Sequence, residues 1–181
     1  MPFPATGPYK THFGMFVGEV HDERETMEVL IQKMRILAGS VDVILLEYYP
    51  EGETPFLKLE DQIGADLERF NKTFNMKARI AKQVYRLWSM AYYFGIDVRG
   101  IEQPTPGHLK PGSMPYLMHR MSAEVNQAYL DVVDKYAQEK GRQSVRFCMY
   151  GGLVHWVKIK RLAPTITGYR INGTNTDLVA I

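Results

Sequence analysis

Two histidines in the chain follow a glycine at the same spacing, each directly after an apolar run. The two segments are residues 18–21 (Gly-Glu-Val-His) and 152–155 (Gly-Leu-Val-His). A glycine at this point lets the chain turn sharply and approach a ligand closely, so that the imidazole faces back over the end of the run. Because His21 and His155 are far apart in the sequence, they exclude a local finger-like metal motif and require a site assembled from distant segments.

Charged residues also stand at or near the ends of the apolar runs. Glu19 follows the first run, Glu47 ends the second, and Arg99 lies within the third, with Glu102 just beyond it. No other part of the chain places titratable side chains so consistently after apolar segments. These residues, together with His21 and His155, are the candidate catalytic set.

This combination of side chains suits hydrolytic chemistry in two ways. Two neutral imidazoles and a carboxylate are ligands for a divalent ion such as manganese, cobalt, zinc or iron, and His21, Glu47 and His155 supply that set. An open coordination position would hold a water molecule of lowered pKa. Without a metal, a paired histidine and glutamate can still take a proton from water, while Arg99 keeps Glu47 or Glu102 ionised or stabilises an oxyanion.

Each candidate also has a structural interpretation. His21 can bond to the first turn of a helix, and His155, beside Trp156, can be a buried core histidine. Glu19 and Glu47 can be ion-pair partners at strand ends. A salt bridge between Arg99 and Glu102 would account for both of them. The remaining histidines, His12, His108 and His119, are expected to have packing or surface roles.

The apolar runs predict a sheet that brings these residues together. Strands are predicted at 12–17, 41–47, 97–101, 145–150 and 165–171, and helices at 22–38, 57–75, 77–94, 116–140 and 154–162. Alternation with long crossovers favours an α/β fold with a mostly parallel sheet of about five strands and helices on both faces. In such sheets ligands bind outside the carboxyl ends of the strands, where the candidate residues stand.

Length and composition are those of one globular domain. The chain has 181 residues, of which 45% are hydrophobic and 23% charged, which excludes a disordered chain. We expect an extended lead-in over residues 1–10 and a single domain over 11–181. The net charge of +2 is too small to indicate a nucleic-acid partner or an anionic membrane. No signal peptide or membrane-spanning run is visible, and the single cysteine, Cys148, is expected to be a buried thiol.

The paired Gly-x-x-His segments, with a glutamate ending the second predicted strand, resemble the Tiki/TraB superfamily. That group includes erythromycin-esterase-like proteins, ChaN-like haem-uptake lipoproteins and domains of large bacterial toxins. The matching segments are 18–21, 45–47 (Leu-Leu-Glu), 99–102 (Arg-Gly-Ile-Glu) and 152–155, followed by 168–171 (Gly-Tyr-Arg-Ile). The likeness spans residues 12 to 171.

The resemblance implies an α/β fold with its site at the carboxyl ends of the strands. It implies metal-dependent peptide hydrolysis in some relatives, metal-free ester hydrolysis in others, and haem or iron binding in others. By position, Glu19, His21, Glu47 and His155 would be the catalytic or ligand set. We therefore expect a hydrolase acting on an ester or a peptide bond of a small-molecule or peptide substrate, located in the cytoplasm or delivered within a toxin. The alternatives are a haem-binding or small-ligand-binding module and an interaction domain with a degenerate site.

Overall fold

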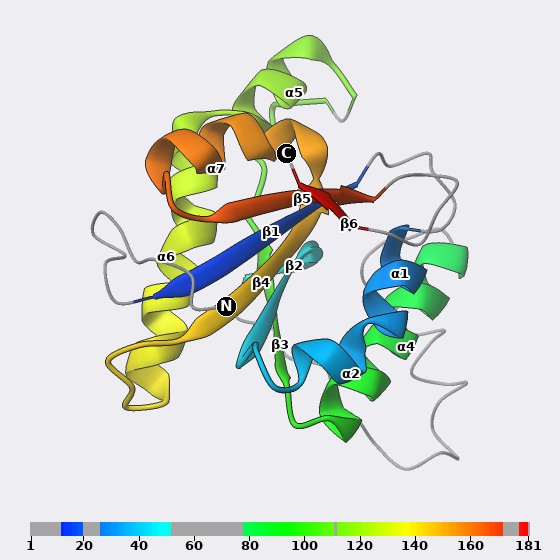
Figure 1. The fold of residues 1–181 in the computed structure, drawn as a ribbon. Coiled ribbons are helices and arrows are strands. Elements are labelled where there is room, and N and C mark those ends of the chain that lie inside the picture. The colour runs from blue at the N-terminus through cyan, green and yellow to red at the C-terminus, as the bar shows by residue number, and fades with distance from the viewer. Residues whose placement is uncertain (1–11, 20–25, 52–77, 111, 172–177, 181) are drawn as a thin grey trace.

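The structure, a computed structural model, describes residues 12–19, 26–51, 78–110, 112–171 and 178–180. Its centre is a six-stranded sheet with the strand order β3-β2-β4-β1-β5-β6 (Figure 1). The first five strands along the chain are parallel, and β6 pairs antiparallel with β5. The predicted α/β class and parallel sheet are confirmed. The strands are β1 (Phe13–Glu19), β2 (Val43–Pro50), β3 (Asp97–Glu102), β4 (Arg146–Gly152), β5 (Thr167–Ile171) and β6 (Leu178–Ala180).

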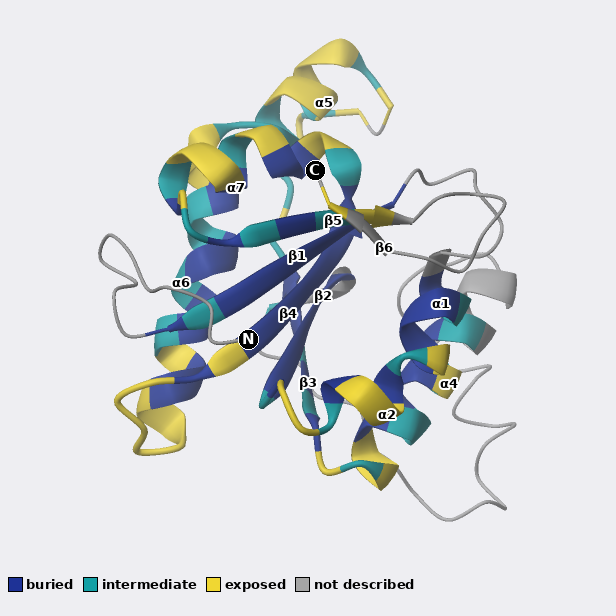
Figure 2. Ribbon diagram, in the orientation of Figure 1, coloured by how far each residue is buried: buried dark blue, intermediate teal, exposed yellow. Residues whose placement is uncertain are grey.

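Helices cover both faces of the sheet because the inner strands are apolar on both faces. Successive strand residues point to opposite faces, so Ile44 and Leu46 join one buried cluster while Val43 and Leu45 join the other. Figure 2 shows β1 and β4 buried over most of their length between the two helical layers. The first layer contains α1 (Thr26–Gln32), α2 (Met34–Leu37) and α4 (Ala78–Tyr93), and the second contains α6 (Ala123–Glu139) and α7 (Trp156–Leu162).

The prediction of a single helix over residues 116–140 is wrong, because this segment forms two helices. α5 (Met114–Arg120) is capped by Met121, and α6 begins after Ser122, whose hydroxyl accepts a 3.2 Å hydrogen bond from the Val125 N–H. A serine in this position satisfies one of the unpaired N–H groups of a new helix and so favours a break in the helical run.

Other boundaries also differ from the sequence prediction. The helix predicted to end at residue 38 is divided into α1 and α2. The predicted turn at Gly151 and Gly152 belongs to β4, and a short 3₁₀ turn (Leu153–His155) precedes α7. β6 was not predicted, since three residues are too few for an alternating pattern to be evident. The predicted lead-in over 1–10 and the predicted helix over 57–75 lie outside the described residues.

None of the helices in the described ranges is long and apolar enough to cross a membrane. Cys148 is buried in β4, as expected.

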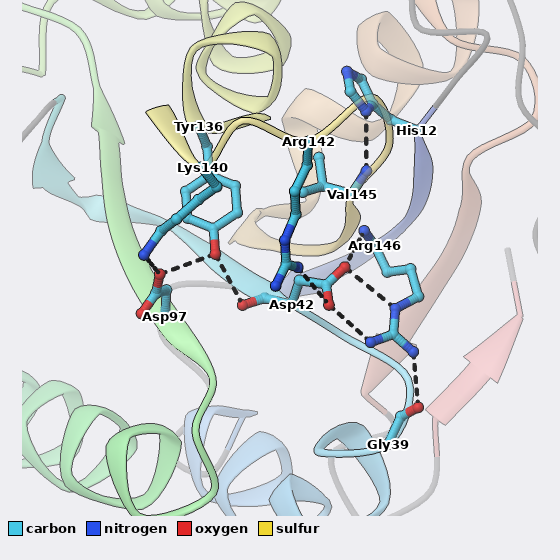
Figure 3. Close-up of polar contacts among 9 residues, drawn as sticks. All are labelled: His12, Gly39, Asp42, Asp97, Tyr136, Lys140, Arg142, Val145 and Arg146. Carbon is cyan, nitrogen blue, oxygen red and sulfur yellow. Dashed lines mark hydrogen bonds and ion pairs between the residues drawn. The ribbon is translucent and has the colours of Figure 1, made fainter. Parts of the chain in front are cut away.

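An ion-pair network joins the amino ends of the strands, at the edge opposite to the candidate site (Figure 3). Asp42 accepts hydrogen bonds from the backbone N–H and the guanidinium of Arg146, and Arg142 lies 3.2 Å from it. His12 is buried here: its Nδ1 accepts the N–H of Val145, and its Nε2 lies 2.7 Å from Asp134. These contacts hold β1, β2 and β4 in register and give His12 the packing role expected for it.

Replacing Asp42 with alanine is expected to lower the free energy of unfolding by about 1–3 kcal/mol, because the Arg146 groups lose their acceptor. Burial raises the pKa of Asp42, but the bonds from Arg146 and the charge of Arg142 outweigh it, so the pKa lies below its ordinary value of 3.8. The stabilisation is therefore present above that value and is lost as the pH falls below it. Urea titrations at pH 7 and pH 3 measure both effects.

The matched control is Glu139→Ala, which removes an exposed ion pair with Arg99 and should cost less than about 1 kcal/mol. Equal losses for Asp42→Ala and Glu139→Ala would contradict the structural role of the network.

Candidate functional site

Glu47 lies in β2 directly after Leu46, the last residue of that strand that pairs with β4, and is the centre of a buried polar cluster. Its side chain is 3% exposed. Oε1 accepts a 2.5 Å hydrogen bond from Arg120 Nη2 and lies 3.2 Å from His155 Nε2. Oε2 accepts a 2.5 Å bond from the backbone N–H of Gly152. One carboxylate therefore joins β2 to β4, to α5 and to the turn that carries His155.

Glycines make room for this arrangement. A Cβ atom on Gly151 would lie 2.4 Å from Oε2 of Glu47, so only glycine lets the carboxylate lie over the end of β4. A Cβ atom on Gly18 would lie 2.6 Å from the Leu153 side chain and 3.2 Å from its Cα. Gly18 therefore lets the 3₁₀ turn that carries His155 pack against β1.

His155 is held through both ring nitrogens. Its side chain is 2% exposed, with Nε2 facing Glu47 and Nδ1 lying 3.0 Å from Oδ1 of Asn126. The Asn126 amide donates a 2.7 Å bond to the carbonyl of Ser122, and the ring of Tyr129 lies 5.3 Å from the imidazole. Apart from Glu47, these partners belong to α6 or to the residue that caps it.

Arg120, the last residue of α5, links Glu47 to Glu102 at the end of β3. The same Nη2 donates 2.5 Å and 2.7 Å bonds to Glu47 and Glu102, and Nη1 donates to the hydroxyl of Tyr116. Arg120 and Glu102 are each 24% exposed. They are therefore the part of the cluster that solvent and a substrate can reach.

The two carboxyl groups have different pKa values. Burial would raise the pKa of Glu47, but the hydrogen bond and charge of His155, the charge of Arg120 and the Gly152 N–H lower it to about 2. Burial raises the pKa of Glu102 to about 7, with a further contribution from the charge of Glu47 and despite the opposing effect of Arg120. At neutral pH Glu47 is ionised, while Glu102 is close to its titration point.

The buried tyrosine beside these carboxyl groups stays protonated. Burial and the charges of Glu47 and Glu102 raise the pKa of Tyr129 far above its ordinary value. Its hydroxyl lies beside Arg120 without a hydrogen bond of good geometry. Tyr129 therefore offers a neutral hydroxyl next to the cluster.

Glu19 lies at the same edge, at the end of β1. It is buried, accepts a hydrogen bond from the hydroxyl of Tyr150, and is in register with Gly152, whose N–H binds Glu47. β1 and β2 lie on either side of β4. Glu19 thus stands next to the Glu47 cluster.

The structure brings Glu47, Glu102 and His155 together and places Glu19 beside them. His21 lies outside the described residues. The sequence suggested that Arg99 keeps Glu47 or Glu102 ionised, but its contacts are with other residues. Its guanidinium donates a 3.2 Å bond to Glu139 and lies over the ring of Tyr136, so the alternative salt bridge with Glu102 is absent as well.

Arg120 takes the place expected for Arg99, and Asn126 and Tyr129 complete the cluster; the sequence analysis missed all three. The sequence predicts one long helix over residues 116–140, in which no single position stands out. The signal that was available is Ser122, since a helix cap at that residue brings the end of one helix and the start of the next to the same point.

A metal ion at this site depends on His21. Within the ranges that the structure describes, no three histidine, cysteine, aspartate or glutamate side chains are arranged to hold one. The oxygens of Glu47 are already bonded to Arg120 and Gly152, and Nε2 of His155 faces the same carboxylate. These donors alone do not fit a cation. The predicted metal site of His21, Glu47 and His155 and the haem alternative stay predictions.

Comparisons with known proteins identify the fold. The chain is similar to a solved structure of the type III effector HopBA1, with a TM-score of 0.60, 16% identity, and coverage of 78% of this chain and 67% of that one. It is also similar to a structure described as bacterial protein toxins (TM-score 0.55, 16% identity) and to RRSP, a MARTX toxin effector domain from Vibrio vulnificus CMCP6 (TM-score 0.50, 16% identity). Each of these two matches covers 93% of this chain, which spans about a third of the toxin chains (35% and 34%).

No family model and no curated protein matches the chain. The resemblance to the Tiki/TraB superfamily therefore stays a prediction. At 16% identity the structural matches show the fold alone: the chain shares an α/β fold with bacterial effector and toxin domains.

Proposed function

We propose that this chain is a hydrolase domain of a bacterial toxin or effector, acting on an ester or peptide bond. The observation that carries the proposal is the cluster of Glu47, Arg120, Glu102 and His155 at the carboxyl edge of the sheet. Two carboxyl groups bonded to the same guanidinium, one ionised and one titrating near neutrality, are the arrangement expected of an acid–base site. The shared fold with effector and toxin domains supports the biological setting.

Glu102 is the acid–base group in this proposal. Its pKa of about 7 and its partial exposure suit a carboxylate that takes a proton from water at neutral pH. The water oxygen then attacks the carbonyl carbon of the substrate. When the bond to the leaving group breaks, the leaving oxygen or nitrogen receives the proton that Glu102 took from the water.

Arg120 supplies the charge stabilisation. Arg120 is partly exposed next to Glu102, so its guanidinium can stabilise the oxyanion that forms on the substrate. Glu47 holds Arg120 and His155 in place through one oxygen. His21 and Glu19 remain the second candidate pair for activating water, since Glu19 lies at the same edge and His21 follows it by two residues.

Turnover of two probes tests the proposal: p-nitrophenyl acetate as an ester and fluorescein-labelled casein as a peptide substrate, each with and without Mn²⁺, Co²⁺ or Zn²⁺. We expect the wild type to hydrolyse at least one, and His155→Ala to lose about 100-fold or more. His12→Ala is the matched control, a buried histidine at the opposite edge. A folded wild type that turns over neither probe, or a fully active His155→Ala, would refute the hydrolase assignment.

A further inference from the structure

We propose that Asn126 is a positioning residue that keeps a proton on Nδ1 of His155 and fixes the orientation of its ring. In this arrangement Nδ1 of the imidazole carries a proton and Nε2 is presented to Glu47. The part that this plays in turnover rests on the proposed hydrolase function. The protonation of the His155 ring does not depend on that function.

The burial of Asn126 shows that its amide has a specific role. It is fully buried, in the first turns of α6, although asparagine is a poor helix former and a buried amide is costly unless it is bonded. Two contacts satisfy it: Nδ2 donates to the Ser122 carbonyl at 2.7 Å, and Oδ1 lies 3.0 Å from His155 Nδ1. An apolar residue would serve packing better, so the polar contacts explain the side chain.

The orientation of this amide is determined by its partners. The carbonyl of Ser122 can only accept a hydrogen bond, so the group facing it must be the NH₂ of Asn126. The amide oxygen therefore faces His155, and an oxygen that accepts requires a proton on Nδ1. Because Asn126 stands four residues after Ser122, the residue that caps α6, the first turn of this helix fixes the geometry.

The other ring nitrogen of His155, Nε2, faces the carboxylate of Glu47. Nε2 lies 3.2 Å from Oε1 of Glu47, a carboxylate that is ionised at neutral pH. The Tyr129 ring, tilted by 48° at 5.3 Å, packs against the imidazole. Nε2 is thus the nitrogen that faces Glu47, and Asn126 acts on the Glu47 cluster through it.

Long-range ¹H–¹⁵N NMR spectra of the full chain, labelled at the histidine ring nitrogens, test the proposal. We expect a protected Nδ1-bound proton for His155, assigned by its absence in His155→Gln. The signal should persist in Asn126→Asp, which keeps an acceptor oxygen, and disappear in Asn126→Leu. Gln127→Leu is the control, since Gln127 bonds to Asp131 on the same helix.

Turnover provides the second measurement. Asn126→Leu should lower kcat by about 10- to 100-fold with KM unchanged, and Asn126→Asp should retain more of the rate. An Nδ1 without a proton in the wild type, or unchanged ring signals in Asn126→Leu, would overturn the proposal. If Asn126→Leu fails to fold, the spectra of the wild type and Asn126→Asp still decide it. Absent turnover with the expected spectra would refute only the hydrolase function.

Discussion

Glu47→Gln is expected to lower the free energy of unfolding by about 3–5 kcal/mol. The glutamine removes the buried carboxylate that Arg120 and His155 both face. It also turns one of the two acceptor oxygens into a donor that meets the N–H groups of Arg120 or Gly152. Urea titration at pH 7, followed by tryptophan fluorescence, measures the loss.

The pH dependence of the Glu47 effect has a definite sign. The pKa of Glu47 in the folded protein is lowered to about 2, so its stabilisation is present above the ordinary value of 4.5 and is lost as the pH falls towards 2. The difference between wild type and Glu47→Gln should therefore shrink in acid.

Glu51→Gln is the matched control for Glu47→Gln. Glu51 is a quarter exposed and bonds to Lys135 and Gln103, so this change should cost less than about 1 kcal/mol. Losses of equal size for Glu47→Gln and Glu51→Gln would show that the Glu47 cluster is not a coupled buried unit.

Glu102→Gln is expected to reduce turnover by about 10²- to 10⁴-fold, since the proposed base can no longer accept a proton. The rate of the wild type should rise with pH through an inflection near 7, the pKa of Glu102, and the variant should lose this inflection. Rates measured from pH 5 to pH 9 with the better of the two probes check both statements. Glu139→Gln, an exposed residue paired with Arg99, is the control.

Stability separates a catalytic role of Glu102 from a structural one. Its pKa is raised in the folded protein, so the stabilisation due to its neutral form is full below 4.5 and is lost as the pH rises through about 7. Glu102→Gln keeps a neutral side chain at every pH and should remove this loss. A variant that loses activity only in proportion to unfolded protein would contradict the catalytic role.

The sheet and its functional edge could be predicted from the sequence because each relies on a local pattern. Continuous apolar runs mark strands that are buried on both faces, and long crossovers between them make the strands parallel. Once the strands are parallel, residues at their carboxyl ends must meet. This is why the sequence alone points to Glu47, Glu102 and His155, which the structure brings together.

Arg99 shows where the same reasoning fails. Arg99 and Glu102 are close in the sequence, but three strand residues span about 10 Å. Arg99 lies within β3 and reaches the carboxyl end of α6 at Glu139, while Glu102 lies at the end of the strand beside Arg120. Proximity along a strand does not place two side chains in one site.

Arg120 and Asn126 could not be predicted because tertiary packing selects them. α5 has no buried residue, and Figure 2 shows it exposed at the carboxyl edge, where Arg120 bonds to Glu47 and Glu102. Asn126 is recognisable only when His155 is placed against α6. Both depend on contacts between residues that are far apart in the sequence.

A crystal structure that shows His21, with data collected at the metal absorption edges, tests the central claim most directly. The claim is that the two Gly-x-x-His segments deliver their imidazoles to one site around Glu47. We predict the His21 ring within hydrogen-bond or shared-ligand distance of Glu19, Glu47 or His155. A His21 ring directed away from this edge, with Arg120 and Glu102 closed off from solvent, would contradict the account.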